Sequence, residues 1–143
     1  MMTPSVLFLC TGNSARSQMA EGFLRHLAGD RFDVASGGIN PTQVNPLAIA
    51  AMREVGIDIS SHQSKSAGSL LGRHFTYVIT VCDHANERCP IFPGAVKRLH
   101  WSLEDPAAAT GTDIERLAVF RRVCGEIAQR VRSFIEEQPS PSG

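Results

Sequence analysis

Short apolar runs alternate along the chain with longer segments in which apolar residues recur every three or four positions. Apolar runs predict buried strands at residues 5–9 and 77–81, and two further strands are expected at residues 32–35 and 96–101. The helical periodicity predicts three longer helices, at about residues 14–28, at 46–55, and from 112 or 113 to 137. A fourth, short helix is expected at residues 83–88, because that segment has an acidic start and a basic end.

Residues that favour turns and helix ends support these boundaries. Ser36-Gly37-Gly38 is expected to stop the second strand. Pro46 suits the first turn of the second helix, and Gly56 stands just past its end. Thr112, with Glu115 three residues later, predicts a capping box at the start of the last helix.

Buried strands that alternate with helices predict an α/β fold, with a parallel sheet and helices on both of its faces. The 143 residues suffice for one domain, which we expect to span residues 1–137. Residues 138–143 are polar and rich in Pro and Ser, so we expect a disordered tail.

Charge and composition narrow the classes of function. The 14 basic and 14 acidic residues balance, which argues against a nucleic-acid partner and against a polybasic membrane surface. No apolar run approaches the roughly 20 residues of a membrane-spanning helix, and no secretory signal is visible. We therefore expect a cytoplasmic protein, in which the four cysteines are catalytic, redox-active, metal-binding or simply buried.

Three residues whose side chains could take part in catalysis follow predicted strands. Cys10 follows the first strand, Cys82 the third and Asp105 the fourth. Ligands of parallel α/β sheets bind at the carboxyl ends of the strands. The topology can therefore bring these three residues to one rim of the sheet.

The segment from Cys10 to Ser17 has the pattern Cys-x5-Arg-Ser between a strand and a helix. Such a loop directs backbone N–H groups toward one point and forms a nest for a tetrahedral oxyanion. Arg16 can bind two oxyanion oxygens, Gly12 allows a turn with positive φ, and Ser17 can donate a hydrogen bond to a Cys10 thiolate. The candidate oxyanion-binding residues are Thr11, Gly12, Asn13, Ser14, Ala15, Arg16 and Ser17.

The run VLFLCTGNSARSQMAE, residues 6–21, resembles the signature of the low-molecular-weight tyrosine phosphatase superfamily. It is most similar to the arsenate reductases on that fold, and the likeness extends over residues 4–137. Further matching segments are VNPLA at 44–48, GIDIS at 56–60, CDHANERCP at 82–90 and WSLEDP at 101–106. The resemblance implies a three-layer αβα fold with a four-stranded parallel sheet in the order 2-1-3-4.

The resemblance also implies a mechanism. In the similar reductases Cys10 attacks arsenate, Cys82 attacks Cys10 and releases arsenite, and Cys89 then attacks Cys82. Thioredoxin reduces the resulting disulfide, so the expected partners are arsenate and thioredoxin, acting on a monomer. Asp105 is the expected general acid, and no cofactor is expected beyond an external thiol reductant. Glutaredoxin or a small thiol remains open as the reductant.

Two alternatives remain at this point. The chain could be a low-molecular-weight tyrosine phosphatase, since the shared anion loop implies at least weak phosphatase activity in either case. It could also be a non-catalytic module that senses redox state or oxyanions through Cys82 and Cys89. Against a tyrosine phosphatase, three alanines at 107–109 stand where those enzymes place an aromatic that stacks on the substrate.

Some related reductases hold a potassium ion near Asn13, Ser36 and an acidic residue after the second helix. Lys65 stands at that third position, so we expect no metal. Its ammonium either replaces the ion or is simply solvated.

Cys124 lies on the apolar stripe of the last helix and is expected to be a buried bystander.

The spacing of Cys82 and Cys89 predicts a conformational change. On a continuous helix, seven residues separate the Cα atoms by about 10.5 Å along the axis. A disulfide tolerates at most about 7 Å. The segment is therefore either never helical or unwinds on oxidation, and we favour unwinding because so short a helix is unstable without packing.

Overall fold

The computed structural model describes residues 3–82, 92 and 95–138 of the chain. Its centre is a four-stranded sheet in the order β2-β1-β3-β4, in which each neighbouring pair is parallel. The strands are β1 (Ser5–Cys10), β2 (Asp33–Gly38), β3 (Tyr77–Thr80) and β4 (Lys97–His100). The expected order and direction of the strands are thereby confirmed.

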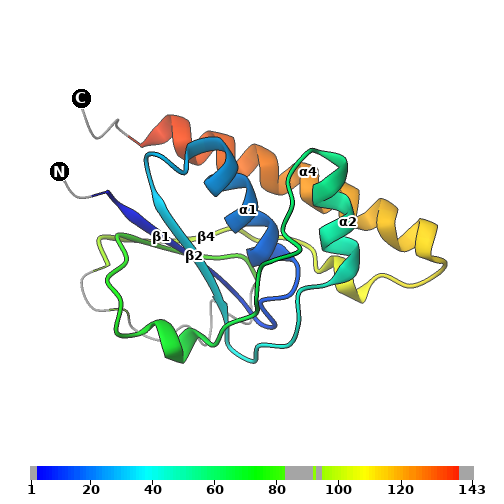
Figure 1. Cartoon of the computed structure of the whole chain (residues 1–143), viewed down its shortest axis with the longest axis horizontal. Helices are drawn as coiled ribbons and strands as arrows, with labels where there is room; N and C mark the ends of the chain where they lie inside the picture. The colour runs from blue at the N-terminus through cyan, green and yellow to red at the C-terminus, as the bar shows by residue number, and fades with distance from the viewer. Residues whose placement is uncertain (1–2, 83–91, 93–94, 139–143) are drawn as a thin grey trace.

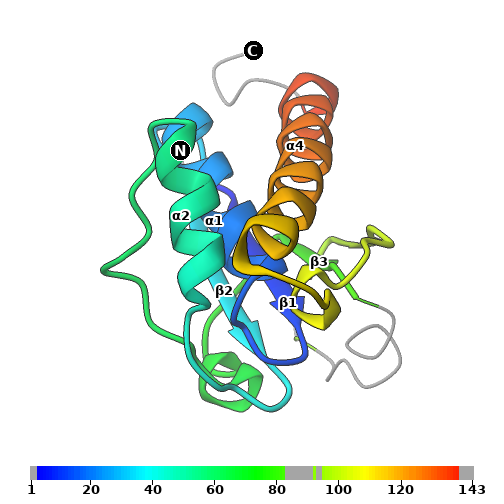
Figure 2. The same ribbon diagram turned by 90° about the vertical axis from the view of Figure 1, so that its right-hand side faces the viewer.

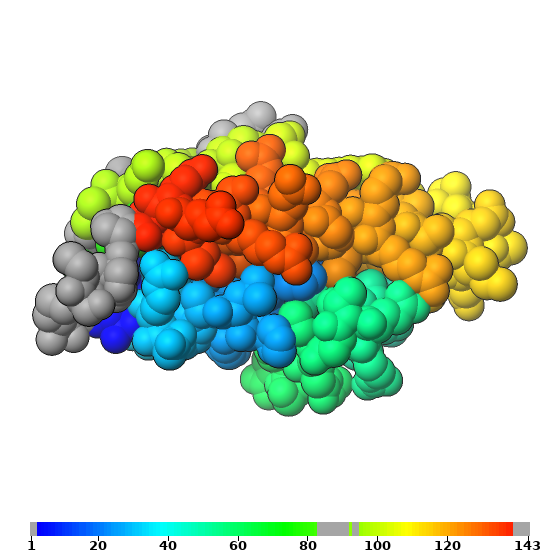
Figure 3. All heavy atoms as spheres, turned by 90° about the horizontal axis from the view of Figure 1, so that it is seen from above, coloured from blue at the N-terminus to red at the C-terminus, as the bar shows by residue number. Residues whose placement is uncertain are grey.

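Three α-helices form a layer on one side of this sheet, as Figures 1 and 2 show. They are α1 (Arg16–Ala28), α2 (Pro46–Glu54) and α4 (Asp113–Glu137). Helix α1 packs on β1 and β2, and α4 packs against both α1 and α2. Figure 3 views this layer from outside, where α4 runs along most of the molecule beside the other two helices.

On the opposite side of the sheet lies the short 3-10 helix η1 (Ala67–Leu70), which packs against β2. Gly37 marks this contact, because a Cβ on it would lie 2.8 Å from the Leu70 side chain. The helix expected at residues 83–88 lies outside the described residues. None of the described helices has the length and apolar character needed to cross a membrane.

Local sequence rules explain where α4 begins and where α2 begins and ends. The Thr112 hydroxyl accepts from the backbone N–H of Glu115, and the Glu115 carboxylate accepts from the backbone N–H of Thr112, so the predicted capping box is confirmed. Asn45 caps α2 ahead of Pro46, and Gly56 follows with φ of +85°.

The predicted end of the second strand is wrong. Strand β2 continues through Ser36, Gly37 and Gly38, where the sequence was expected to stop it. Gly38 pairs with Cys10, and a Cβ on it would lie 2.7 Å from the Thr11 carbonyl oxygen and 2.8 Å from the Asn13 nitrogen. Gly38 is therefore present because another backbone approaches closely, and not because the strand turns. A smaller difference is η2 (Pro106–Ala108), a 3-10 turn within the expected loop.

Candidate active site around Cys10

Residues 11–15 form a loop between the end of β1 and the start of α1, and the chain after β2 holds this loop from outside. Its carbonyl groups accept backbone hydrogen bonds from that chain. The four pairs, donor first, are Ile39 to Cys10, Asn40 to Thr11, Thr42 to Gly12 and Asn45 to Ser14. The Asn13 carbonyl oxygen accepts from the side chains of Gln18 and Ser64.

The carbonyls of this loop are bound from outside, and the Asn13 N–H points inward to the Cys10 sulfur. Helix α1 adds further donors, since its first turn carries N–H groups without intrahelical partners and no side chain caps it at Ala15 in the described chain. The result is an anion-binding nest at a helix N-terminus. Residues 39–45 were not identified from the sequence, because backbone donors carry no side-chain signal.

One detail of the loop differs from expectation. The positive φ, +48°, belongs to Asn13 and not to Gly12. Asparagine tolerates this region better than most residues. Gly12 is needed for a different reason, because a Cβ there would lie 3.1 Å from the Thr42 hydroxyl of the supporting segment.

The Cys10 sulfur lies inside this loop and is 3% exposed as a residue. It accepts a hydrogen bond from the Asn13 backbone nitrogen at 3.1 Å, and the Ser17 hydroxyl lies 2.8 Å away. Amide, hydroxyl and helix dipole all favour negative charge on this sulfur. The sulfur is therefore in an environment suited to a nucleophilic thiolate.

The direction of the Ser17 hydrogen bond follows from its neighbours. The Asn13 side-chain oxygen accepts from the Lys65 backbone N–H, which fixes the orientation of the amide. The Asn13 amide nitrogen then donates to Ser17 Oγ at 2.8 Å. Since the Ser17 oxygen is already an acceptor there, its own hydrogen is available to Cys10. Ser17 is therefore able to donate to the sulfur.

The side-chain amide of Asn13 also belongs to a buried polar cluster. Asn13 Nδ2 also donates to Ser36 Oγ at 3.0 Å, and Ser36 in turn donates to the Glu21 carboxylate. Glu21 is 3% exposed and pairs with Arg25 at 2.8 Å. A buried carboxylate is stable only when it is paired and hydrogen-bonded in this way. No local sequence pattern signals this cluster, because polar residues on a helix are ordinarily exposed.

Gln18 and His62 extend the cluster toward the surface. Gln18 is fully buried; its amide nitrogen contacts the Asn13 and Gln63 oxygens, and its own oxygen accepts from His62 Nδ1 at 3.0 Å. Burial lowers the pKa of His62 below its ordinary 6.5, and the nearby Glu21 carboxylate only partly opposes this. His62 was not predicted to contribute to the site.

Arg16 lies at the first position of α1, and its side chain reaches the loop after β4. Its guanidinium donates to the Leu103 carbonyl oxygen at 3.0 Å and lies 3.8 Å from the Asp105 carboxylate. Asp105 has extended backbone angles before Pro106, as expected, and is about half exposed. The structure therefore joins Cys10, Arg16 and Asp105 through one helix end and one loop.

Cys82 follows β3, the strand beside β1, and is also buried. Its sulfur lies 3.3 Å from the hydroxyl of Thr11, the residue after Cys10. The structure therefore brings Cys82 to the anion loop. Cys89 and the proposed unwinding of its segment lie outside the described residues.

Cys124 is in a different place. It is buried on α4 as expected, and its sulfur contacts Met52 at 3.7 Å. Burial raises the pKa of this thiol to about 11. It is therefore protonated, and inert as a nucleophile, near neutral pH.

The residues near Lys65 have their polar atoms engaged. Asn13 Oδ1 accepts two hydrogen bonds, and Ser36 Oγ both donates and accepts. The Lys65 ammonium donates to the Gln63 carbonyl oxygen at 3.1 Å. Within the described ranges, no group of three or more His, Cys, Asp or Glu side chains is arranged to hold a metal ion.

Comparisons with known proteins agree with this geometry. The family model described as low molecular weight phosphotyrosine protein phosphatase matches residues 5–139. An arsenate reductase of Halalkalibacterium halodurans is 50% identical over 131 residues, which cover 92% of this chain and 94% of that protein.

Solved structures give the same result. An arsenate reductase in a phosphate-binding state superposes with a TM-score of 0.82 at 36% identity, covering 94% of this chain and 98% of the other. A thioredoxin-dependent arsenate reductase of Corynebacterium glutamicum gives 0.70 at 32% identity, over 95% of this chain and 64% of that one.

Proposed function

The chain belongs to the low molecular weight phosphotyrosine protein phosphatase family, and we propose that within it this protein is a thioredoxin-dependent reductase of arsenate to arsenite. The anion loop binds the tetrahedral arsenate through its N–H groups and Arg16. The reaction begins at Cys10 and ends on an external dithiol.

In the first step the Cys10 thiolate attacks arsenic and forms a sulfur–arsenic bond. One arsenate oxygen leaves as water, and Asp105 supplies the proton for it. Support comes from the position of Asp105 beside Arg16, which places a carboxyl group at the edge of the anion loop. Arsenic is still pentavalent after this step.

In the second step Cys82 attacks the Cys10 sulfur. A disulfide forms, the sulfur–arsenic bond breaks, and its electron pair stays on arsenic, which leaves as arsenite. Cys89 then attacks Cys82 and frees Cys10, and thioredoxin reduces the Cys82–Cys89 disulfide. Two thiols are oxidised for each arsenate reduced, so the electrons balance. No resident metal or cofactor takes part in this scheme.

The observation that carries this proposal is the contact between Thr11 and Cys82. A phosphatase needs one thiolate and a water molecule, and has no use for a second buried thiol at its anion loop. Phosphate-ester hydrolysis remains a side activity of the loop, since Cys10 and Arg16 serve both reactions. Ala107, Ala108 and Ala109 offer no aromatic wall for a phosphotyrosine ring.

The test compares two activities in one set of variants. Arsenate reduction is followed in the presence of thioredoxin, thioredoxin reductase and NADPH, and ester hydrolysis is followed with p-nitrophenyl phosphate. Cys10→Ser should abolish both. Cys82→Ser and Cys89→Ser should stop multiple-turnover arsenate reduction and spare hydrolysis.

Cys124→Ala is the matched control, because it removes a buried thiol distant from the loop and should spare both activities. Equal loss of both activities in Cys82→Ser would mean that Cys82 serves the structure, and the reductase mechanism would be wrong. Reduction by glutaredoxin or a small thiol in place of thioredoxin would change the partner and leave the cysteine mechanism intact.

A further inference from the structure

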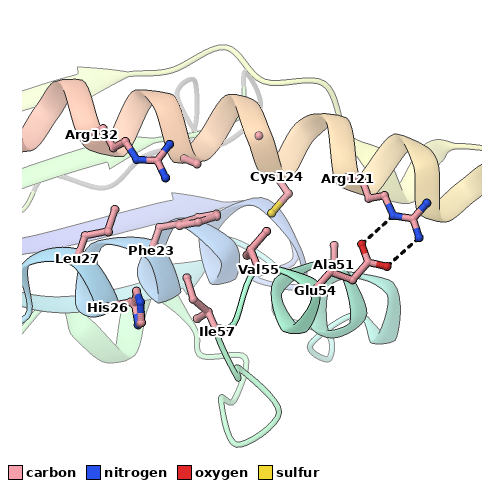
Figure 4. A pocket seen from close by; sticks show the side chains of 12 residues that line it. Phe23, His26, Leu27, Ala51, Glu54, Val55, Ile57, Arg121, Cys124 and Arg132 are labelled. Atoms are coloured by element: carbon pink, nitrogen blue, oxygen red, sulfur yellow. Dashed lines mark hydrogen bonds and ion pairs between the residues drawn. The ribbon is translucent and has the colours of Figure 1, made fainter.

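A cavity lies within the helix layer, where α1, α2 and α4 meet (Figure 4). Its volume is about 370 Å³, which falls in the range of roughly 300–1,000 Å³ usual for small-molecule sites. None of its lining residues belongs to the anion loop. Its apolar surface comes mainly from Phe23, Leu27, Ala51, Val55, Ile57 and Ala128.

Two of these apolar residues are exposed to solvent. Leu27 on α1 is 42% exposed, and Val55, the residue after α2, is 54% exposed. Both line the cavity, so the helix layer leaves apolar surface uncovered at this point. The cavity can therefore bury further apolar surface from a ligand.

The charged residues that line this cavity give one of its ends a net positive charge. Glu54 is neutralised by Arg121, whose Nε and Nη2 lie 2.7 and 2.8 Å from the two carboxylate oxygens. Arg132 has no ion pair among the described residues, and Figure 4 shows its guanidinium extending from α4 over the space beside Phe23. The exposed His26 also lines the cavity.

Part of the cavity wall on α4 is a glycine. Gly125 lies in the middle of a 25-residue helix, where glycine lowers helix stability. Its φ is not positive, and a Cβ added to it would find nothing within 4 Å. Neither the backbone nor the packing therefore requires glycine here. Its effect is to keep this wall bare and the cavity open.

Cys124 completes the floor. Its side chain points toward the cavity in Figure 4, and its protonated thiol carries no charge that would repel an anion. Apolar walls, a neutral floor and one unpaired arginine at the end are together complementary to an amphipathic anion.

We propose that this cavity binds a small organic anion, with a flat apolar body beneath α4 and a carboxylate or sulfonate at Arg132. The site is separate from the anion loop, and its occupancy does not depend on arsenate chemistry.

The test uses 1-naphthoate as the probe and amide chemical shifts in the full chain as the readout. We expect saturable shifts at residues of α1, α2 and α4 that line the cavity. The uncharged analogue 1-naphthylmethanol should bind more weakly. Arg132→Gln should weaken naphthoate binding by about two- to fivefold, which is the range of exposed charge pairs. Arg130→Gln is the matched control on the same helix and should leave binding unchanged.

Gly125→Leu fills the cavity from its bare wall and should weaken binding by at least about tenfold, in a protein that stays folded because a Cβ at this position has no neighbour within 4 Å. Arsenate turnover by this variant should equal that of the unmodified protein. Unchanged naphthoate binding by Gly125→Leu would overturn the proposal. Equal affinity for naphthoate and naphthylmethanol would overturn the role of Arg132. Concentration-dependent shifts in the same residues without any ligand would show an interface between copies of the chain, which also overturns it.

Discussion

The hydroxyl of Thr11 lies 3.3 Å from the sulfur of Cys82, so the residue next to the first thiol is in contact with the second. Thr11 comes from the end of β1, and Cys82 follows β3, the neighbouring parallel strand. The contact therefore depends on strand order and not on any proximity in sequence. A thiolate formed on Cys82 would receive a hydrogen bond from this hydroxyl.

Replacement of Thr11 by valine should affect only the second half of the reaction. The variant keeps the shape of the side chain and the backbone N–H, and loses a hydrogen bond worth about 0.5–1.5 kcal/mol. Arsenate turnover should fall about two- to tenfold, while p-nitrophenyl phosphate hydrolysis stays within twofold. Thr42→Val, which contacts the same loop from outside, is the control. Parallel loss of both activities in Thr11→Val would place the effect on the loop itself.

Ser17→Ala should make Cys10 a poorer nucleophile. The variant removes a donor to the sulfur, and hydrogen bonds to charged groups contribute about 1.5–3 kcal/mol. The rate of alkylation of Cys10 by iodoacetamide near neutral pH should fall about tenfold or more, measured by mass spectrometry on a Cys82→Ser background. Ser69→Ala, an exposed serine on η1, serves as the control. An unchanged alkylation rate would mean that Ser17 accepts from a thiol.

His62 should make the stability of the protein sensitive to mild acid. Its pKa is below the ordinary value of 6.5 in the folded state, chiefly through burial. As pH falls through about 6.5 the unfolded chain therefore takes up a proton before the folded protein does. The free energy of unfolding should decrease across this window and be fully present above it.

His62→Gln retains a donor for the Gln18 oxygen and should remove that dependence between about pH 7 and 5.5, measured by urea unfolding at several pH values. His26→Gln, on an exposed position of α1, should leave the slope unchanged. The same slope in His62→Gln as in the unmodified protein would show that other groups account for it.

Two helical glycines should respond to alanine in opposite directions. Gly125→Ala should stabilise the protein by up to about 1 kcal/mol and raise Tm by about 2–4 °C, because its Cβ meets open space. Gly22→Ala should destabilise it, since a Cβ there would lie 2.8 Å from Ile59 and 2.9 Å from Met52. Calorimetry on both variants checks the pair. A loss of stability in Gly125→Ala would mean that this wall of the cavity is closed.

The sequence predicted the parts of this molecule that rest on local chemistry. Apolar runs identified β1 and β3, and Thr112 with Glu115 identified the start of α4. Cys10, Arg16, Cys82 and Asp105 could be identified because each stands at a strand end or in a loop of recognisable pattern. The strand order came from the resemblance to a family, because no local pattern encodes it.

What the sequence missed depends on contacts between distant segments. Gly37 and Gly38 suggested a turn, since nothing local signals that the Leu70 side chain will approach Gly37 or that the backbone of the anion loop will approach Gly38. Gln18 and Glu21 gave no sign of burial, because a polar residue is buried only where partners from other segments meet it. The supporting bonds from residues 39–45 use backbone atoms, which every sequence possesses.

The same supporting bonds decide when the anion loop comes into being during synthesis. Cys10 is among the first residues to leave the ribosome, yet the carbonyls around it are bound by residues 39–45, and Arg16 is held by Leu103. A nascent chain that ends before these segments carries Cys10 as an unremarkable thiol without its nest. Its capacity to attack an oxyanion arises only when about three-quarters of the polypeptide has been made. Premature termination therefore yields fragments that carry the signature motif but cannot attack an oxyanion.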